Sequence, residues 1–322
     1  MPVGTNEETV LSQYVPGFRA NLNLAPQQMK SKLFDCVVGS MDYDTPGTQF
    51  NADDVLPTDP EIVQTRVPDT PDKFLAFTRR VGFFGEVQDA AWLDNIDKAK
   101  TLEDPTGATM QAMMAGKGRM IDNTILAAAV GTAYERQDGP EAAPTAVAFP
   151  AAQIVAAGDV QLAHQGEVVP DDGSDYGLSV GKLLYAGLLL DDSELDGEER
   201  YIAAGPMQKA DLLRTTPVTS TYYAEVQALA AGKIDVFLGF RFVWLPRARL
   251  PLKAGSATVR RIIAWEKPAL VYNARPVTNA RISIRTDKSD TPQAFYKFSQ
   301  GAVRRYDKGV CAIDCLEKIA KA

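Results

Sequence analysis

One pentapeptide in the chain matches a catalytic pattern. Residues 177–181, Gly-Leu-Ser-Val-Gly, have the form G-x-S-x-G, which in α/β-hydrolases holds a nucleophilic serine on a turn between a strand and a helix. That chemistry needs a strand before the serine, and an acid and then a histidine after it. Here a polar loop, 170–175, precedes the serine, and the single histidine, His164, lies upstream of it. We therefore interpret Ser179 as the N-cap of the following helix, and a serine hydrolase using Ser179 is only a remote alternative.

Other chemistry-bearing residues do not assemble into a site. Three cysteines and one histidine cannot supply the His/Cys cluster of a zinc site. Cys311 and Cys315 would lie about 13 Å apart along a strand, too far for a disulfide, so we predict small buried apolar residues there. The aspartates at 171, 172 and 175 lack the spacing of a calcium loop, and Gly181-Lys182 lacks the rest of a phosphate-binding loop. The sequence therefore predicts no catalytic residue, no metal and no cofactor.

Composition is typical of a globular protein. The chain has 322 residues, 45% of them hydrophobic and 23% charged, which suits one large domain or two closely packed ones. The net charge of −7 argues against tight, charge-driven nucleic-acid binding as the main activity. No stretch approaches the roughly 20 apolar residues of a membrane span, and residues 1–15 do not resemble a secretory signal. We expect a protein kept in a cytoplasm, without membrane contact.

The charges are distributed unevenly along the chain. Residues 41–72 are mostly acidic, whereas residues 241–308 carry a large excess of arginine and lysine. These segments can be read as two solvated faces, or as an acidic segment of one subunit that meets a basic surface of another. The candidate inter-subunit residues are Asp53, Asp54, Glu61, Arg66, Arg281, Arg285, Arg304 and Arg305.

A long helix is expected to organise the fold. The stretch 104–134 opens with Asp104 as N-cap and Pro105 at the first helical position, and apolar residues then recur at helical spacing. Such a helix would be about 45 Å long. Gly116 and Gly118 would each cost it roughly 1 kcal/mol, so it needs packing along its length to persist. The methionines interpreted as core packing are Met110, Met113, Met114 and Met120.

The other expected elements indicate a mixed α+β fold. Residues 1–40 read as an extended arm, with a short helix or strand at 28–38, and residues 41–72 read as a long excursion. A short helix is expected at 89–101, where Asp94 and Asp97 share a face and suit a solvated or inter-subunit ion pair. Further expected helices are 180–190, 206–213 and 219–231. Expected strands are 74–84, 200–204, 234–237, 241–244, 259–265, 281–285 and a hairpin of 302–306 with 310–314 around the turn 307–309.

One stretch near the middle of the chain resembles a known family. Residues 227–247, QALAAGKIDVFLGFRFVWLPR, contain the pattern Gly-x-Ile-x-x-Phe-Leu-Gly-Phe-x-x-Val and resemble the major capsid proteins of tailed bacteriophages. The stretches that resemble the same family in the same order are 93–105, 122–134, 200–213 with the threonine-rich 215–220, and 301–310. The resemblance spans about residues 70–315, and the ordered set is more specific than any single stretch.

The resemblance implies the HK97-like phage capsid fold, of class α+β. The implied parts are an N-terminal arm at 1–40, an extended β-hairpin loop at 41–80, a peripheral domain with the spine helix at 81–145, an axial α/β domain at 146–250 and a return to the peripheral domain at 251–322. The implied function is structural rather than enzymatic: hexamers and pentamers would assemble into the icosahedral head shell around phage double-stranded DNA. Assembly would take place in the host bacterial cytoplasm, and the subunit would end in the virion.

Departures from the family pattern refine the expected partners. Some members cross-link subunits through a lysine on the extended loop, but here no lysine precedes Lys73 in it, so no such bond is expected. Some carry a long scaffolding segment at the N-terminus, whereas the arm here is short, so a separate scaffolding protein is expected. A portal protein and a decoration or cement protein are further candidate partners, and the acidic chain should contact packaged DNA only weakly on the inner face. An encapsulin-type compartment of the same fold is the main alternative.

Overall fold

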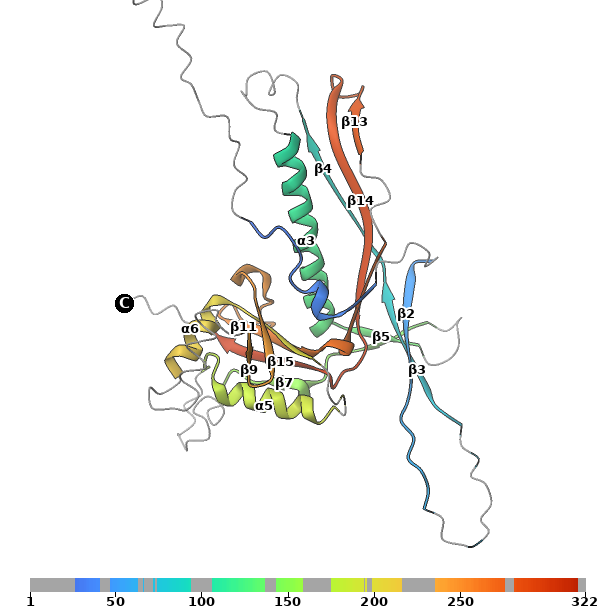
Figure 1. Ribbon diagram of the computed structural model, residues 1–322, viewed down its shortest axis with the longest axis vertical. Coiled ribbons are helices and arrows are strands. Elements are labelled where there is room, and N and C mark those ends of the chain that lie inside the picture. Colours follow the sequence, from blue (N-terminus) through green and yellow to red (C-terminus); the bar gives the residue numbers. More distant parts are fainter. Residues whose placement is uncertain are drawn as a thin grey trace, which may run out of the picture.

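The molecule is elongated, with a long helix and long strands at one end, a compact α/β part beside them, and a loop that projects from the opposite end (Figure 1). Among the described residues, no helix is both long enough and apolar enough to cross a membrane. The computed structural model describes residues 27–40, 47–62, 66, 72, 74–93, 106–136, 143–158, 175–193, 195, 199–215, 235–275 and 281–317.

Helix α3 (Thr106–Val130) is the predicted long helix, and it runs for 25 residues. Its predicted start at Asp104 and Pro105 lies outside the described residues. The helix ends before the predicted Tyr134, because the chain turns at Gly131 and then forms strand β5 (Ala133–Glu135). The prediction is therefore confirmed for the body of the helix and wrong for its last turn.

The methionines of α3 point in different directions. Met113 is buried in a cluster with Tyr296 and Phe298, so its interpretation as core packing is confirmed. Met114 and Met120 are 53% and 40% exposed. For these two residues the interpretation is wrong, because their side chains are not enclosed by the described residues.

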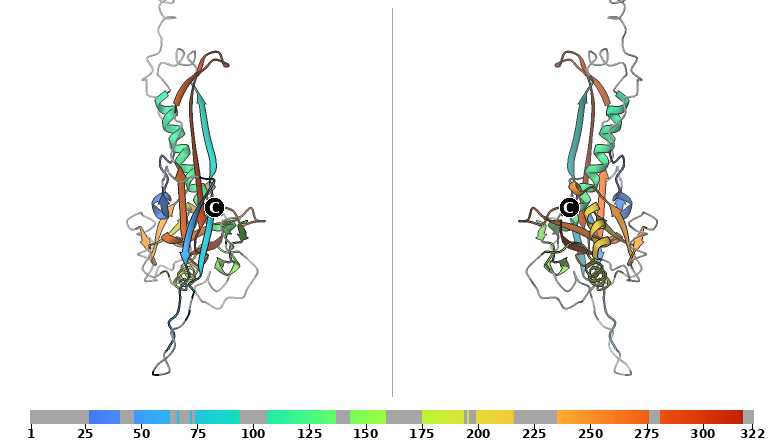
Figure 2. Two further views of the ribbon diagram at one scale, coloured as in Figure 1. Left: turned by 90° about the vertical axis from the view of Figure 1, so that its right-hand side faces the viewer. Right: turned by 90° about the vertical axis from the view of Figure 1, so that its left-hand side faces the viewer.

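A five-stranded sheet, called here the spine sheet, lies along α3 (Figures 1 and 2). Its strands are β1 (Val38–Ser40), β12 (Leu270–Arg275), β14 (Thr291–Arg304), β13 (Arg281–Arg285) and β4 (Gly85–Trp92). The long strand β14 pairs antiparallel with β4, β12 and β13, and β1 pairs in parallel with β12. The predicted strand 281–285 is confirmed. The spine sheet thus gives α3 the lateral packing that its glycines require.

The helix predicted at 89–101 is wrong over its first residues. Residues 89–92 belong to β4, whose register with β14 places Asp89 opposite Tyr296 and Trp92 opposite Gln293. Pairing with a distant strand outweighs a local helical pattern here. Asp94 and Asp97 lie outside the described residues.

A six-stranded sheet, called here the axial sheet, forms the α/β part. Its strands in order are β7 (Ile154–Val155), β15 (Val310–Leu316), β11 (Val259–Glu266), β8 (Arg200–Ala204), β10 (Phe240–Trp244) and β9 (Val236–Phe237). Helices α5 (Val180–Asp191) and α6 (Pro206–Thr215) lie beside it, and their apolar residues share one buried cluster with the strands. The predicted strand 200–204 and the helices at 180–190 and 206–213 are confirmed, whereas the helix predicted at 219–231 lies outside the described residues. Short 3₁₀ turns are η1 (Phe34–Cys36), η2 (Ala151–Gln153), η3 (Arg247–Arg249) and η4 (Lys267–Ala269).

The hairpin predicted around 307–309 is wrong, although the turn itself exists. The strand before the turn, β14, ends in the spine sheet with Arg304 opposite Leu270. The strand after it, β15, begins in the axial sheet with Val310 opposite Trp265. Two chain segments, β11 to β12 and β14 to β15, therefore pass together from one sheet to the other. A local turn signal specifies the reversal but not the partner of each strand.

A third sheet of four strands carries the projecting loop. Its order is β2 (Gln49–Val55), β3 (Phe77–Phe83), β5 and β6 (Thr145–Val147). β2 and β3 pair antiparallel from Gln49 opposite Phe83 to Val55 opposite Phe77, and the loop between them runs away from the body (Figure 1). The predicted strand 74–84 is confirmed as β3, whereas its partner β2 lies inside the stretch 41–72 that was predicted as the excursion.

Candidate assembly surfaces

The loop between β2 and β3, called here the extended loop, exposes apolar side chains. Ile62 is 88% exposed and Phe74 93%, and Leu56 and Leu75 are also exposed. At the strand ends next to the loop, Phe77 of β3 is 70% exposed, and Val55 of β2 is exposed as well. No other described residue encloses these side chains, and an exposed apolar patch of this kind marks an interaction surface. Charge alone did not point to them, although apolar residues within a polar, proline-rich loop are a readable signal.

Two acidic candidate residues bond to their own chain at the base of the extended loop. Asp53 accepts hydrogen bonds from Arg79 Nε and Nη2 at 2.6 and 2.8 Å. Asp54 accepts from Arg305 Nε at 2.9 Å and from Tyr306 Oη at 2.8 Å. Burial alone would raise the pKa of Asp54, but the bonds from Arg305 and Tyr306 outweigh burial and leave that pKa below its ordinary value. The structure therefore brings Asp54 and Arg305 together within one subunit.

Arg304, another candidate, lies inside the molecule. Its side chain is 0% exposed, and its Nη1 donates to the carbonyl oxygens of Ala129 at 3.1 Å and Gly131 at 2.7 Å. These carbonyls belong to the C-terminal end of α3, where a positive charge is favoured by the helix dipole. Arg304 Nε also donates to Asp307 at 2.6 Å, and the guanidinium lies 5.0 Å from the ring centroid of Phe149. In this conformation Arg304 binds the C-terminal end of α3, and none of its side chain is exposed for contact with another subunit.

Asp307 connects this helix end to the extended loop. Besides its bond from Arg304, it accepts a hydrogen bond from Arg80 Nη2 at 2.8 Å. Arg80 lies on β3, so one carboxylate joins the end of α3 to the strand that carries the loop. Asp54 and Asp307 thus hold the loop base against the body within one chain, whereas the bond between Asp53 and Arg79 joins the two strands of the base to each other.

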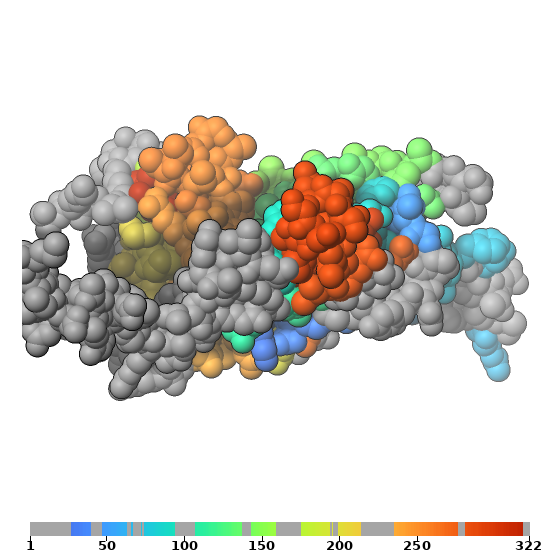
Figure 3. Space-filling view, turned by 90° about the horizontal axis from the view of Figure 1, so that it is seen from above, coloured from blue at the N-terminus to red at the C-terminus, as the bar shows by residue number. Residues whose placement is uncertain are grey.

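Two of the remaining basic candidates, Arg281 and Arg285, belong to β13. The tip formed by β13 and β14 lies at the opposite end of the molecule from the extended loop (Figure 1) and faces the viewer in Figure 3. β13 exposes Ile282 and Ile284 to 53% and 66%, with Arg281 also exposed. Arg285 Nε donates to Asp287 Oδ1 at 2.9 Å within the same tip. The tip therefore combines apolar and basic side chains on an edge strand. The last two candidates, the acidic Glu61 and the basic Arg66, are both exposed on the extended loop.

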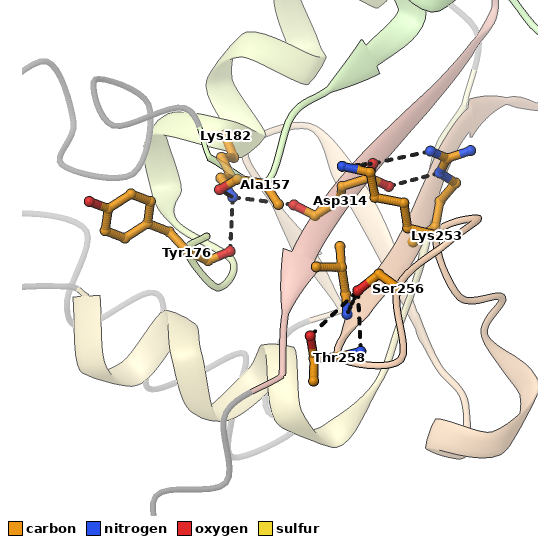
Figure 4. Close-up of polar contacts among 9 residues, drawn as sticks. Ala157, Tyr176, Lys182, Lys253, Ser256, Thr258 and Asp314 are labelled. Carbon is orange, nitrogen blue, oxygen red and sulfur yellow. Dashed lines mark hydrogen bonds and ion pairs between the residues drawn. The ribbon is translucent and has the colours of Figure 1, made fainter. Parts of the chain in front are cut away.

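The G-x-S-x-G serine has a structural role. Ser179 is 1% exposed, and its Oγ accepts a hydrogen bond from Lys182 N at 3.2 Å as N-cap of α5. Lys182 is buried beneath it, and its Nζ donates to the carbonyls of Ala157, Tyr176 and Asp314 at 3.1–3.2 Å (Figure 4). Residues 175–179 form no strand, so the predicted N-cap is confirmed and the hydrolase geometry is not present there. His164 lies outside the described residues.

The cysteines are buried thiols. Burial raises the pKa of Cys36 to about 11 and the pKa values of Cys311 and Cys315 to about 12. Such thiols are protonated and inert at neutral pH. The prediction that Cys311 and Cys315 are buried apolar residues is confirmed. Within the described ranges, no group of three His, Cys, Asp or Glu residues is placed to hold a metal.

The arrangement of spine helix, spine sheet, axial sheet and extended loop is the HK97-like capsid fold. The capsid protein of Ralstonia phage GP4 superposes with a TM-score of 0.69 at 13% identity, over 96% of this chain and 97% of that one. The capsid of cyanophage P-SCSP1u gives 0.66 at 13%, over 96% and 95%. The SrpI encapsulin of Synechococcus elongatus gives 0.55 at 9%, over 98% and 97%. At these identities the likeness shows the fold alone.

Sequence comparison then places the chain within a family. The phage capsid protein family matches residues 10–317, nearly the whole chain, whereas no curated protein sequence matches it. The chain belongs to the phage capsid protein family. It is a major capsid protein, the structural subunit of a phage shell, and its place is in the virion.

Proposed function

We propose that the chain assembles as hexamers and pentamers into an icosahedral shell that encloses double-stranded DNA, and that the extended loop of one subunit lies on the spine sheet of another. The observation that carries the proposal is the set of apolar side chains on the extended loop, led by Phe74 at 93% exposure. Fully burying a phenylalanine side chain is worth about 1.5–3 kcal/mol. A contact repeated around a closed shell would multiply that gain.

Charge and position favour the β13 tip as the surface that receives the loop. The loop carries acidic residues such as Asp59 and Glu61, and the tip carries Arg281 and Arg285 beside exposed isoleucines. The two surfaces lie at opposite ends of one subunit, so they can meet only between copies. A contact between two different surfaces of identical subunits is head-to-tail, and it closes into rings when the rotation between copies permits.

The apolar half of this proposal is tested by Phe74→Asp. Because an added charge cannot be buried without a partner, we expect the variant to remain folded as discrete subunits and to lose closed shells in electron micrographs. Phe74→Leu is the matched control, since it keeps an apolar side chain at the same place, and it should still assemble. Normal shells from Phe74→Asp would remove the extended loop from the interface.

The charged half is tested by reversing Arg281 and Arg285 to glutamate. Like charges would then face the acidic loop, so shell yield should fall, and the deficit should deepen at low salt. Asp59→Arg with Glu61→Arg in the same chain should restore part of the yield if loop and tip meet. Unchanged assembly of the first double variant would refute the charge pairing.

The covalent state and the contents of the shell are proposed together. Subunits should migrate as single monomer bands after boiling in detergent, because the extended loop has no lysine before Lys73. A ladder of covalent oligomers would contradict this.

Shells should protect double-stranded DNA from nuclease, and they should hold that DNA weakly because the chain is acidic. Enzyme cargo in place of DNA would favour an encapsulin-type compartment. Closed shells that need a co-expressed scaffolding protein would support the expected separate scaffold.

A further inference from the structure

The described N-terminal segment crosses the spine helix at one closely fitted place. A Cβ on Gly118 of α3 would lie 2.8 Å from Ser31 N and 2.9 Å from the carbonyl carbon of Lys30. Both neighbours are backbone atoms, so no side-chain movement can relieve the contact. The glycine that weakens α3 as an isolated helix is therefore the place where the segment passes over it.

A buried carboxylate one turn further along α3 binds the same segment. Asp122 is 1% exposed. It accepts hydrogen bonds from Ser31 Oγ at 2.6 Å and from the backbone N–H groups of Lys32 and Leu33, each at 3.1 Å, and Gln28 Nε2 also donates to it. Hydrogen bonds to an ionised acceptor are among the stronger ones in proteins.

Two further contacts fix the ends of the segment. Arg119 Nη1, between the glycine and the aspartate, donates to Gln27 Oε1 at 2.7 Å. Lys32 Nζ donates to the carbonyl oxygen of Trp244 on β10 at 2.8 Å. Beyond them Leu33, 0% exposed, enters the buried cluster shared by α3, the axial sheet and the spine sheet. The segment therefore spans all three parts.

We propose that Gly118, Arg119 and Asp122 form a docking site for residues 27–33, and that they are positioning residues for assembly. By fixing residue 27 on the spine helix, the site sets where the chain enters the described body of the subunit. The same docking holds the axial sheet at one angle to α3. The assembly part of this inference rests on the proposed function, whereas the docking itself does not.

A pair of glycine variants tests the docking. Gly118→Ala adds a methyl group where backbone already lies, whereas Gly116→Ala, two residues away on the same helix, meets only side-chain atoms at 3.7 and 3.9 Å. We expect hydrogen exchange of the Lys32 and Leu33 amides, which donate to Asp122, to accelerate roughly tenfold or more in Gly118→Ala and to stay unchanged in Gly116→Ala, with the amides of β11 and β15 unchanged in both. Equal behaviour of the two variants would overturn the inference.

Asp122→Asn gives an independent test at nearly constant volume. The amide keeps one oxygen, which can still accept from Lys32 and Leu33 in place of Oδ1, but it puts a donor in place of Oδ2, where Gln28 Nε2 and Lys32 N also donate. Because the negative charge is also lost, the bonds to the segment weaken, and exchange of the Lys32 and Leu33 amides should accelerate as well. Acceleration spread equally over β11 and β15 would show general destabilisation and would also overturn the inference.

The assembly readout separates this inference from the proposed function. If the unaltered chain forms shells, Gly118→Ala and Asp122→Asn should form irregular or open particles, while Gly116→Ala should form shells of normal size. Normal shells from all three variants would refute the positioning role. Absence of shells from the unaltered chain would refute the proposed function, and the exchange data would then decide on the docking alone.

Discussion

At the scale of single residues, buried charges hold the subunit together. Arg304 binds the carbonyl end of α3 and the carboxylate of Asp307 with none of its side chain exposed. Glu317 plays a comparable part at the end of β15. It accepts a hydrogen bond from Arg247 Nε at 2.5 Å and pairs with Arg260 Nε at 3.0 Å. Each charge is compensated inside the chain, so removing one partner leaves another unsatisfied.

Arg304→Ala should destabilise the subunit strongly. It leaves two helix-end carbonyls without their donor and Asp307 without its buried partner, so we expect a loss of about 3 kcal/mol or more in the free energy of unfolding. Urea unfolding followed by circular dichroism measures this loss. Arg281→Ala, at an exposed position, is the control and should change stability by less than about 0.5 kcal/mol. Equal stabilities for the two variants would contradict the role given to Arg304.

Glu317 predicts part of the pH dependence of stability. Burial alone would raise the pKa of Glu317, but the bonds from Arg260, Gln208 and Arg247 leave it below the ordinary value of 4.5. A carboxyl group whose pKa is lower in the folded state stabilises the fold above its unfolded pKa, and that stability is lost as the pH falls through the folded pKa.

Unfolding measured from pH 7 to pH 3 should therefore show stability declining below about pH 4.5 in the unaltered chain. Glu317→Gln should be less stable by about 1–3 kcal/mol at pH 7, because the charge-assisted bonds are lost. Its stability should fall less steeply with acid. Parallel pH curves for the two chains would contradict the assignment.

Single-residue roles were predictable from sequence where they depend on local geometry. Ser179 precedes an apolar helix and is its N-cap, and Cys311 and Cys315 are buried, as predicted. The partner of a charged residue depends on the fold. Asp54 and Arg305 lie about 250 positions apart in the chain, and they meet because the end of β14 packs against the sheet that contains β2 and β3. Whether the exposed candidates, Glu61 among them, meet another subunit stays a prediction.

At the scale of elements, long-range pairing decided what local pattern could not. Helices α5 and α6 and strand β8 have clear periodicity and turn signals, and all three were predictable. The residues of β4 read locally as a helix, and the chain around Asp307 reads as a hairpin turn. In both places the local pattern is outweighed by β14, a strand of 14 residues that pairs with β4 and β12.

At Gly301, strand β14 passes close to the end of β3 at the base of the extended loop. A Cβ there would lie 2.4 Å from the carbonyl oxygen of Phe83. Gly301→Ala should therefore cost about 1–3 kcal/mol through overpacking. Gly85→Ala, on the neighbouring strand, meets its nearest atom, Gln300 O, at 3.7 Å and should be nearly neutral. Thermal unfolding of the pair measures the difference, and a neutral Gly301→Ala would show that the crossing is looser than described.

At the scale of the whole molecule, the single subunit leaves two apolar surfaces exposed. Its apolar extended loop and its basic, apolar β13 tip lie at opposite ends, and neither is covered by the described part of its own chain (Figure 1). The capsid fold was predictable from the ordered family resemblance rather than from periodicity. The sequence pattern alone gave only an α+β chain with a long helix and a long excursion, because the arrangement of three sheets depends on pairings across the whole chain.

Assembly itself tests the account most directly. The measurement is negative-stain electron microscopy of the purified chain, expressed alone and together with a scaffolding protein. We predict closed shells, or rings of five and six subunits, whose number falls sharply in Phe74→Asp. Discrete monomers or dimers at high concentration, with scaffold present, would contradict the claim that the extended loop of one subunit packs on another copy of the chain.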